Sequence, residues 1–148
     1  MSVFYLSLGS NIAPEKNIPA CLKKLSAYWP QIRFSTIYET DPVGPAGTQK
    51  FWNLAAELQT QKTESELRAD LREIEAALGR VRIPGARFAP RTIDIDILPQ
   101  ADYQHQAFIM IPLAEIAPHH VDKETGLSFA ALANRVREDS GGFRAIRF

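Results

Sequence analysis

The sequence predicts an α+β fold in which an antiparallel sheet carries helices on one face and a functional site on the other. Segments with strand and helix character follow one another in the order strand, helix, strand, strand, helix, strand, which is the order of the ferredoxin-like split arrangement. The strands alternate between apolar and polar side chains, as strands with one buried face do. Of the 148 residues, 45% are hydrophobic, so residues 1–148 are expected to form a single domain with its own core.

The charges balance, with 17 lysines and arginines against 17 aspartates and glutamates. This balance argues against a protein dedicated to nucleic acid or to a membrane surface. One cysteine, Cys21, excludes an internal disulfide, and its place among apolar helical residues predicts a buried side chain rather than a nucleophile. The sequence has no apolar run of membrane-span length and no signal-peptide pattern at its start. We therefore expect a soluble, cytoplasmic protein without nucleic-acid or membrane partners.

The first part of the chain is expected to form two strands with a helix between them. An apolar, β-prone strand over residues 3–8 ends at the turn-forming residues 9–11. A helix can open at Pro14, but Pro19 predicts that it begins later or is distorted. The second strand covers residues 31–38.

The third strand, residues 51–58, has two distinct faces. One face carries core-forming side chains: Trp52, Leu54, Ala56 and Leu58. The other carries Phe51 and Asn53, an aromatic ring beside an amide, which could stack on and hydrogen-bond a flat heterocycle. An ordinary mixed face covered by a loop is the alternative. The preceding loop, residues 40–50, holds two prolines and two glycines, and it is either functional or a plain connection.

Thr63 and Glu66 form a capping-box pattern, which predicts the start of the second helix. Apolar residues then recur at helical spacing, and Gly79 suits the left-handed conformation that ends such a helix. Glu75 lies near this end and off the apolar stripe. It is either a solvated surface acid or a brace for an arginine or a nucleotide.

The next segment carries four arginines with no carboxylate among them: Arg80, Arg82, Arg87 and Arg91. A short strand follows in which isoleucines alternate with Asp94 and Asp96, so both carboxylates share one face. Their Cα atoms should lie about 7 Å apart, a spacing at which two magnesium ions could be held and could clamp a polyphosphate. Arginines bind phosphate oxygens bidentately, so the stretch points to phosphoryl-type transfer from a nucleotide. The alternative is an ordinary half-buried strand whose acids the arginines neutralise.

The last third is expected to contain smaller elements. Residues 107–111 predict a short edge strand, residues 112–117 a short helix opened by proline, and residues 127–136 a last helix. His119 and His120 are adjacent and are expected on the surface. The sequence contains no P-loop and no dinucleotide-binding glycine motif, so a nucleotide would be held by arginines and metal.

Seven stretches together resemble the 6-hydroxymethyl-7,8-dihydropterin pyrophosphokinase family of folate biosynthesis. In chain order they are residues 8–11, 38–45, 51–53, 75, 79–82, 90–97 and 112–118. The most specific is the block Pro-Arg-Thr-x-Asp-x-Asp that begins at Pro90. The resemblance implies that ATP donates a pyrophosphoryl group to the pterin hydroxymethyl oxygen and leaves as AMP.

The resemblance also implies roles for individual residues. Two magnesium ions would be held with ATP by Asp94 and Asp96, and the catalytic arginines would be Arg80 and Arg91. The nucleotide would contact Glu75, Arg82, Arg87, Phe88, Arg91 and Ile97. The pterin would be bound by Thr40, Val43, Gly44, Phe51, Asn53 and Phe108. The loops around both segments close over the substrates in this family, and a monomer is expected.

The segment after the aspartate strand departs from the family pattern. Residues 98–107 are shorter than usual and lack a His-Pro-type motif and an arginine, while Phe88 stands where many members have tryptophan. Gln106 lies near the position where the family usually has the arginine. Whether His105 takes the role of the family histidine stays open. We expect weaker ATP binding than in full-length relatives, with greater reliance on the remaining arginines. Two alternatives stay open: a pterin- or nucleotide-binding protein with little kinase activity, and a different ATP-dependent transferase on the same scaffold.

Overall fold

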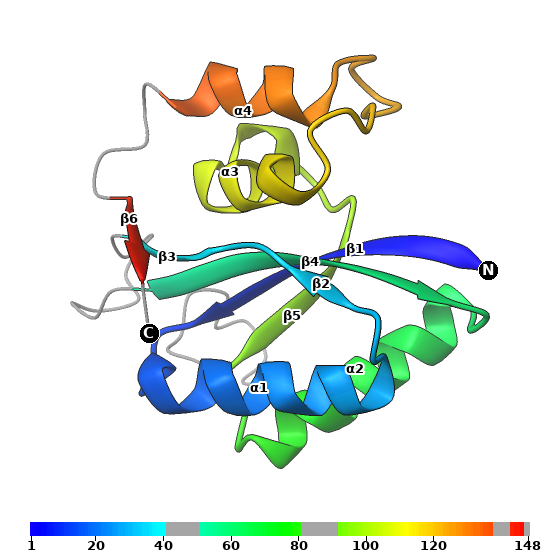
Figure 1. Ribbon diagram of the computed structural model, residues 1–148, viewed down its shortest axis with the longest axis vertical. Helices are drawn as coiled ribbons and strands as arrows, with labels where there is room; N and C mark the ends of the chain where they lie inside the picture. Colours follow the sequence, from blue (N-terminus) through cyan, green and yellow to red (C-terminus); the bar gives the residue numbers. More distant parts are fainter. Residues whose placement is uncertain (41–50, 81–91, 138–142, 147–148) are drawn as a thin grey trace.

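The computed structural model describes residues 1–40, 51–80, 92–137 and 143–146. A sheet of six strands lies between two pairs of helices, with α1 and α2 on one face and α3 and α4 on the other (Figure 1). The elements in chain order are β1 (Ser2–Ser10), α1 (Pro14–Tyr28), β2 (Arg33–Phe34), β3 (Ile37–Thr40), β4 (Phe51–Thr60), α2 (Glu64–Ala77), β5 (Asp94–Leu98), the 3-10 helix η1 (Tyr103–His105), α3 (Ala107–Ile116), α4 (Phe129–Arg137) and β6 (Arg144–Ile146).

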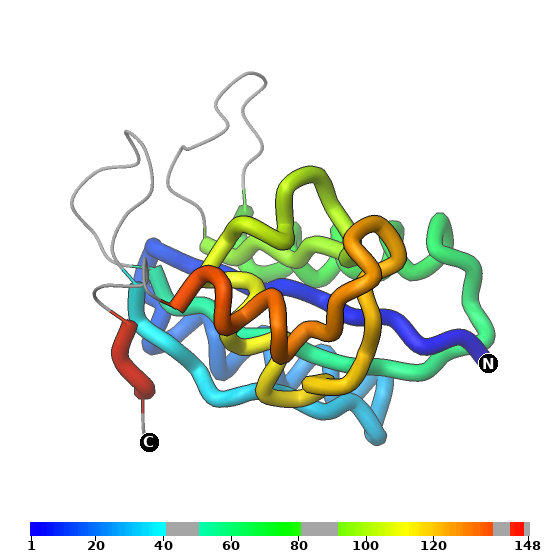
Figure 2. The backbone as a smooth tube through the Cα atoms, turned by 90° about the horizontal axis from the view of Figure 1, so that it is seen from above, coloured from blue at the N-terminus to red at the C-terminus, as the bar shows by residue number. Residues whose placement is uncertain are grey.

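The strands run in the spatial order β5-β1-β4-β3-β6, and β2 pairs with β4 beside β3. Every pairing is antiparallel. Figure 2 shows the sheet from above, with α4 lying over it and β6 beside β3. The predicted α+β class and the ferredoxin-like order of elements are confirmed.

The core between the sheet and the first helix pair uses the apolar strand faces that the sequence predicted. Leu6 and Leu8 of β1, Leu54 of β4 and the three isoleucines at 93, 95 and 97 are all buried there. Cys21 of α1 joins them, and burial raises the pKa of its thiol to about 12, as expected for a structural cysteine. The isoleucines therefore turn the two aspartates of β5 toward the opposite face.

α1 begins at Pro14 and continues without interruption to Tyr28, so the expected later start is wrong. Pro19 lies inside the helix and cannot donate a hydrogen bond to the carbonyl of Glu15. Glu15 is exposed, so water can satisfy that carbonyl and the helix tolerates the proline.

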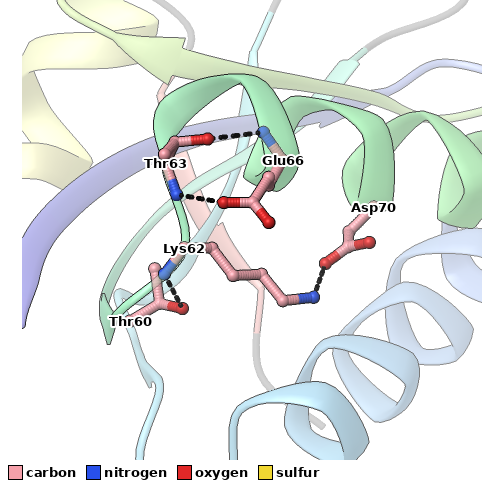
Figure 3. Close-up of polar contacts among 5 residues, drawn as sticks. All are labelled: Thr60, Lys62, Thr63, Glu66 and Asp70. Carbon is pink, nitrogen blue, oxygen red and sulfur yellow. Dashed lines mark hydrogen bonds and ion pairs between the residues drawn. The ribbon is translucent and has the colours of Figure 1, made fainter.

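The capping box at the start of α2 is confirmed. Thr63 Oγ1 accepts from the Glu66 amide at 3.2 Å, and the Thr63 amide donates to Glu66 Oε1 at 3.0 Å (Figure 3). Just before this cap, Lys62 forms an ion pair with Asp70, which lies eight residues further along the chain in α2 (Figure 3). The carboxylate at the third helical position and the cap together fix where α2 starts.

α2 ends as Gly79 predicts. Gly79 has φ 85°, its amide donates to the Ala76 carbonyl at 3.0 Å, and the Arg80 amide donates to the Glu75 carbonyl at 3.1 Å. These two bonds form a Schellman motif, which satisfies carbonyls at the helix end and turns the chain back on itself. Arg80 is thereby brought over Glu75.

The predicted strand over residues 31–38 is divided into β2 and β3. Phe34 pairs with Ala56 and Tyr38 pairs with Asn53, so the intervening stretch has one residue more than its partner in β4. This extra residue makes a bulge, which bends the strand and leaves an amide outside the ladder.

Residues 107–111, predicted as an edge strand, are instead the first half of α3, which continues through the predicted helix 112–117 as far as Ile116. A short continuous apolar run is compatible with a strand or a buried helix, and here the helix is buried on several sides. Its side chains form a second core with α4 and the sheet, which includes Ala55, Ile109, Met110, Leu113, Phe129 and Leu132. The second face of the sheet is therefore partly covered rather than open.

α4 confirms the predicted last helix, and His119 and His120 are exposed, as expected. Within the described ranges, no helix has the length and apolar character needed to span a membrane.

Candidate active site

One row of side chains crosses four strands on the α3 side of the sheet. Asp94 of β5 pairs with Gly9 of β1, Gly9 pairs with Asn53 of β4, and Asn53 pairs with Tyr38 of β3. Paired residues in a sheet point to the same face, so this row brings a predicted metal ligand and a predicted pterin ligand together. The shared face expected from strand alternation is confirmed.

Gly9 makes room for Asn53 at the centre of this row. A Cβ atom on Gly9 would lie 2.8 Å from Asn53 Oδ1, closer than such atoms approach. Asn53 Nδ2 donates to Thr40 Oγ1 at 2.8 Å, and the two residues are only 4% and 6% exposed. A buried amide held this way has a fixed orientation, which suits the recognition of a heterocycle edge.

Arg80 links the end of α2 to the aspartate strand. Its Nη1 atom lies 2.6 Å from Glu75 Oε2 and 2.6 Å from Asp94 Oδ1. Burial acts to lower the pKa of Arg80, but the charges of Asp94 and Glu75 outweigh it and raise the pKa, so the guanidinium stays charged. The Schellman turn at Gly79 explains why Arg80 reaches both carboxylates.

Glu75 is 2% exposed and contacts Arg80. Of the two roles that the sequence left open, it therefore has that of a brace for an arginine. Besides Arg80, its Oε2 accepts from the Ile95 amide at 2.8 Å. Since β5 is an edge strand of the sheet, this bond satisfies an amide and fixes the strand against α2. The alternative of a solvated surface acid is wrong.

Asp96 is the carboxylate of this site with a raised pKa. Burial, the Asp94 charge, a hydrogen bond with Asp94 and the Glu75 charge raise the pKa of Asp96 to about 7, and Arg80 only partly opposes them. Two carboxylates this close, with one guanidinium between three acids, suit a hard cation with oxygen ligands. In the part of the chain that the structure describes, no three acidic, histidine or cysteine groups surround a metal position.

The aromatic residues of the predicted pterin site come from two elements. Phe51 begins β4, opposite Thr40 of β3, and is half-buried. Phe108 lies in the first turn of α3 and packs half-buried against the second core. Ile97, predicted at the nucleotide, has its side chain in the core between the sheet and the first helix pair, so only its main chain is available to a ligand.

Six of the predicted site residues lie outside the described residues: Val43, Gly44, Arg82, Arg87, Phe88 and Arg91.

The segment after β5 is held by a polar network that the sequence did not reveal. Tyr103 donates to Asp122, and Gln104 Nε2 donates to Glu124 Oε2 at 2.8 Å. Burial acts to raise the pKa of Asp122, but hydrogen bonds from Tyr103 and Thr125 outweigh it and lower the pKa to about 2. These partners are 18 to 20 residues apart in a polar stretch, so no local pattern pointed to them.

His105 is exposed in η1. Two further residues that sequence reasoning passed over, Tyr38 and Glu115, hydrogen-bond each other beside the row at 2.7 Å.

One face of the ferredoxin-like sheet gathers carboxylates, an amide and an aromatic ring. This combination of fold and side chains suits the class of small-molecule transferases. The family model described as 7,8-dihydro-6-hydroxymethylpterin-pyrophosphokinase (HPPK) matches residues 5–118. The chain belongs to this family, and the relatives below carry the name of that enzyme.

Three bacterial relatives are named 2-amino-4-hydroxy-6-hydroxymethyldihydropteridine pyrophosphokinase. The one from Pseudomonas aeruginosa is 37% identical over 132 residues, covering 77% of this chain and 80% of the relative. That from Methylorubrum extorquens is 38% identical over 135 residues, covering 80% and 84%. That from Bacillus subtilis is 34% identical over 140 residues, covering 83% and 82%.

A solved structure supports the fold. The crystal structure of Plasmodium falciparum HPPK-DHPS with pteroate matches this chain with a TM-score of 0.76 at 12% identity, covering 99% of this chain and 48% of that one. At this identity the likeness concerns the fold alone.

Proposed function

We propose that this chain transfers the pyrophosphoryl group of ATP to the hydroxymethyl group of 6-hydroxymethyl-7,8-dihydropterin and releases AMP. The observation that carries the proposal is the row Asp94–Gly9–Asn53, which sets a carboxylate two strands away from a buried, oriented amide on one sheet face. Membership of the family supports the reaction, and the row supports neighbouring binding sites for the two substrates.

On the nucleotide side, Asp94 and Asp96 would hold two magnesium ions together with ATP phosphate oxygens. Magnesium commonly binds through one or two carboxylates plus substrate phosphates, which agrees with a site built on Asp94 and Asp96. Bound there, it would supply positive charge against the phosphates and help to orient them. Glu75 and Arg80 keep Asp94 and β5 in place before any ligand arrives.

The remaining phosphate contacts are assigned to arginines. Arg82, Arg87 and Arg91 would bind the triphosphate, with Phe88 and the main chain of Ile97 beside the nucleotide. Arg91 is nearest in sequence to both metal ligands and, with Arg80, would stabilise charge on the transferred group. Arg91→Ala should lower turnover by orders of magnitude, whereas His105→Ala should change it only modestly, as steady-state rates would record. Equal losses in both variants would show that His105 has replaced the family histidine.

On the pterin side, the ring would lie between Phe51 and Phe108, with the Asn53 amide at its edge. Thr40 holds that amide, and backbone groups near Val43 and Gly44 would complete the contacts. The hydroxymethyl oxygen would then face the phosphates held at Asp94. Holding both reactants in this geometry is the main catalytic contribution expected of the chain.

The proposal includes the setting of the reaction: a monomeric, single-domain protein in the cytoplasm that acts on two small molecules. Sedimentation of the purified protein would test the monomer.

A second candidate is a pterin- or nucleotide-binding protein with little kinase activity. It is favoured by residues 98–107, which contain no lysine or arginine. Incubation with ATP, magnesium and the hydroxymethyl dihydropterin separates the two. We expect AMP to form only when all three are present, and Asp94→Asn to abolish it. Tight pterin binding without AMP would support the second candidate instead.

A further inference from the structure

The C-terminal end of α3 is tied to the bulged β2–β3 segment by a cluster of polar contacts. The carboxylate of Glu115 accepts from the Thr36 amide at 2.8 Å, from Thr36 Oγ1 at 2.9 Å and from Tyr38 Oη at 2.7 Å. Arg33 Nη2 donates to the Ile116 carbonyl at 2.6 Å. Four directional bonds thus join the last turn of α3 to the sheet at one place.

The bulge between β2 and β3 provides the donors for this cluster. The extra residue in this stretch takes an amide out of the β4 ladder, and Glu115 satisfies the amide of Thr36. The bond between this amide and Glu115 is exposed to solvent, so its contribution is a directional contact rather than the rescue of a buried amide.

The cluster lies beside the residues assigned to the pterin. Tyr38 is paired with Asn53 in the row that crosses the sheet, and Thr40, which holds the Asn53 amide, is two residues further along β3. Burial and the hydrogen bond to Glu115 both raise the pKa of Tyr38, so the phenol keeps its proton and remains the donor.

α3 carries Phe108 at the opposite end from this cluster. Phe108 and Glu115 are seven residues apart, close to two helical turns, so they lie on the same side of the helix and about 10 Å apart along it. Pro112 has no N–H group, so the carbonyl of Phe108 lacks its usual donor four residues on and the first turn is held less firmly by the helix.

Apolar packing constrains α3 on the sheet, and the directional bonds of Glu115 add a second constraint at its C-terminal end. α3 packs on α4 and β4 through the second core, and hydrophobic contact is non-directional. The hydrogen bonds of Glu115 have preferred lengths and directions, so they set the position of the helix along its axis.

We propose that Glu115 is a positioning residue for pterin binding: through Thr36 and Tyr38 it fixes α3 on the sheet and so sets the place of Phe108 relative to Phe51 and Asn53. This inference rests on the proposed function for the identity of the ligand. It concerns a residue that does not itself touch the substrate.

The test compares Glu115→Ala with wild type by calorimetry, using the pterin and magnesium-ATP separately. We expect pterin binding to weaken about tenfold, while magnesium-ATP binding changes less than about twofold. In steady state, the KM for the pterin should rise by a similar factor with little change in kcat. Tyr38→Phe removes one of the three donors to Glu115, so it should weaken pterin binding by a smaller factor. This variant replaces Glu115→Ala in the test if Glu115→Ala fails to fold.

Glu64→Ala is the matched control. Glu64 is an exposed glutamate paired with Arg68 at 3.2 Å on α2, on the other face of the sheet. It should leave binding of both ligands unchanged. Amide hydrogen exchange of α3 gives a ligand-free readout: exchange in residues 109–116 should speed up in Glu115→Ala, with α1 and α2 unaffected.

The outcomes separate the two proposals. A wild-type protein that does not bind the pterin would defeat the proposed function, while faster exchange confined to α3 would still support the anchoring role of Glu115. Equal weakening of both ligands, or unchanged pterin binding together with unchanged exchange in α3, would overturn the positioning role.

Discussion

Asp96 is buried beside Asp94, so burial first and then repulsion between the two carboxylates disfavour its ionised form. Arg80 contacts Asp94 directly, and its charge only partly opposes the rise in the pKa of Asp96. The pKa of Asp96 is raised to about 7 from an ordinary value of 3.8. A cation bound between them would remove the repulsion, which makes this pair of residues the part of the site most sensitive to pH and to metal.

Asp96 should make the folded protein less stable as the pH rises. Between about pH 4 and about pH 7, Asp96 is protonated in the folded state and ionised in the unfolded state, so the folded state binds more protons. The free energy of unfolding therefore falls through this window. Asp96→Asn should remove the contribution of Asp96 to this decrease in the free energy of unfolding. Without magnesium, the stability of the variant relative to wild type should therefore grow as the pH rises.

Urea unfolding at several pH values without magnesium measures this difference. Asp70→Asn, which removes a half-buried carboxylate paired with Lys62 in α2, is a control that should not show the same dependence. A constant difference between Asp96→Asn and wild type from pH 4 to 7 would contradict the raised pKa.

Gly9 is the second residue on which the site depends. Gly9→Ala places a methyl group 2.8 Å from Asn53 Oδ1, so the amide must move and its bond to Thr40 should be lost. We expect a loss of stability of about 1–3 kcal/mol and weaker pterin binding. In a double-mutant cycle with Asn53→Ala, the effect of Gly9→Ala on binding should largely vanish. Additive losses in the double variant would mean that Gly9 acts elsewhere.

Among the elements, β4 links the two halves of the site. Its residues alternate between the core side, with Leu54 and Leu58, and the ligand side, with Phe51 and Asn53. This division was predicted from the alternation of the sequence. A change on the ligand side of β4 should therefore alter binding without altering the core.

Phe51→Ala should weaken pterin binding far more than ATP binding, because stacking is lost on the heterocycle side only. Isothermal calorimetry with each ligand measures the two losses. Phe34→Ala offers a comparison on neighbouring β2, where the ring packs against the first core, and it should reduce stability more than ligand selectivity. Similar losses for both ligands in Phe51→Ala would argue against a dedicated pterin platform.

The elements also show what the sequence could and could not predict. α2 was predicted at both ends because its signals are local: a capping box at Thr63 and a glycine at 79. α3 was missed in its first half because residues 107–111 are all apolar, and a period of 2 or 3.6 cannot be read from such a run. Packing on α4 and β4 favours the helical conformation of this stretch, and such long-range contacts cannot be read from a single sequence.

At the scale of the whole molecule, the sheet separates two tasks. One face forms the main core with α1 and α2, and the other carries the row of site residues with α3 and α4 beside it (Figure 1). The sequence predicted which residues share the site face, since strand alternation is a local rule. It could not predict that a second helix pair covers part of that face, because contacts such as Glu115 with Thr36, 79 residues away, have no local signature.

This division of the molecule implies that the site can be changed without unfolding the chain. Asp94, Asp96, Asn53 and Phe51 are not part of the core that the sheet forms with α1 and α2, whereas Phe108 packs against the second core. The same arrangement brings Asp94, a predicted metal ligand, and Asn53, a predicted pterin ligand, onto one face of the sheet. The central claim is therefore that phosphate groups held at Asp94 and Asp96 are transferred, as a pair, to a pterin held at Asn53.

ATP labelled at its β-phosphate tests this claim most directly. Wild-type protein is incubated with the labelled ATP, magnesium and the hydroxymethyl dihydropterin, and the products are separated and counted. Transfer of a pyrophosphoryl group puts the label on the pterin and leaves unlabelled AMP, which is the result expected here. Label that remains with the nucleotide as ADP would show transfer of a single phosphoryl group, and label that stays in ATP would show no transfer; either result contradicts the account.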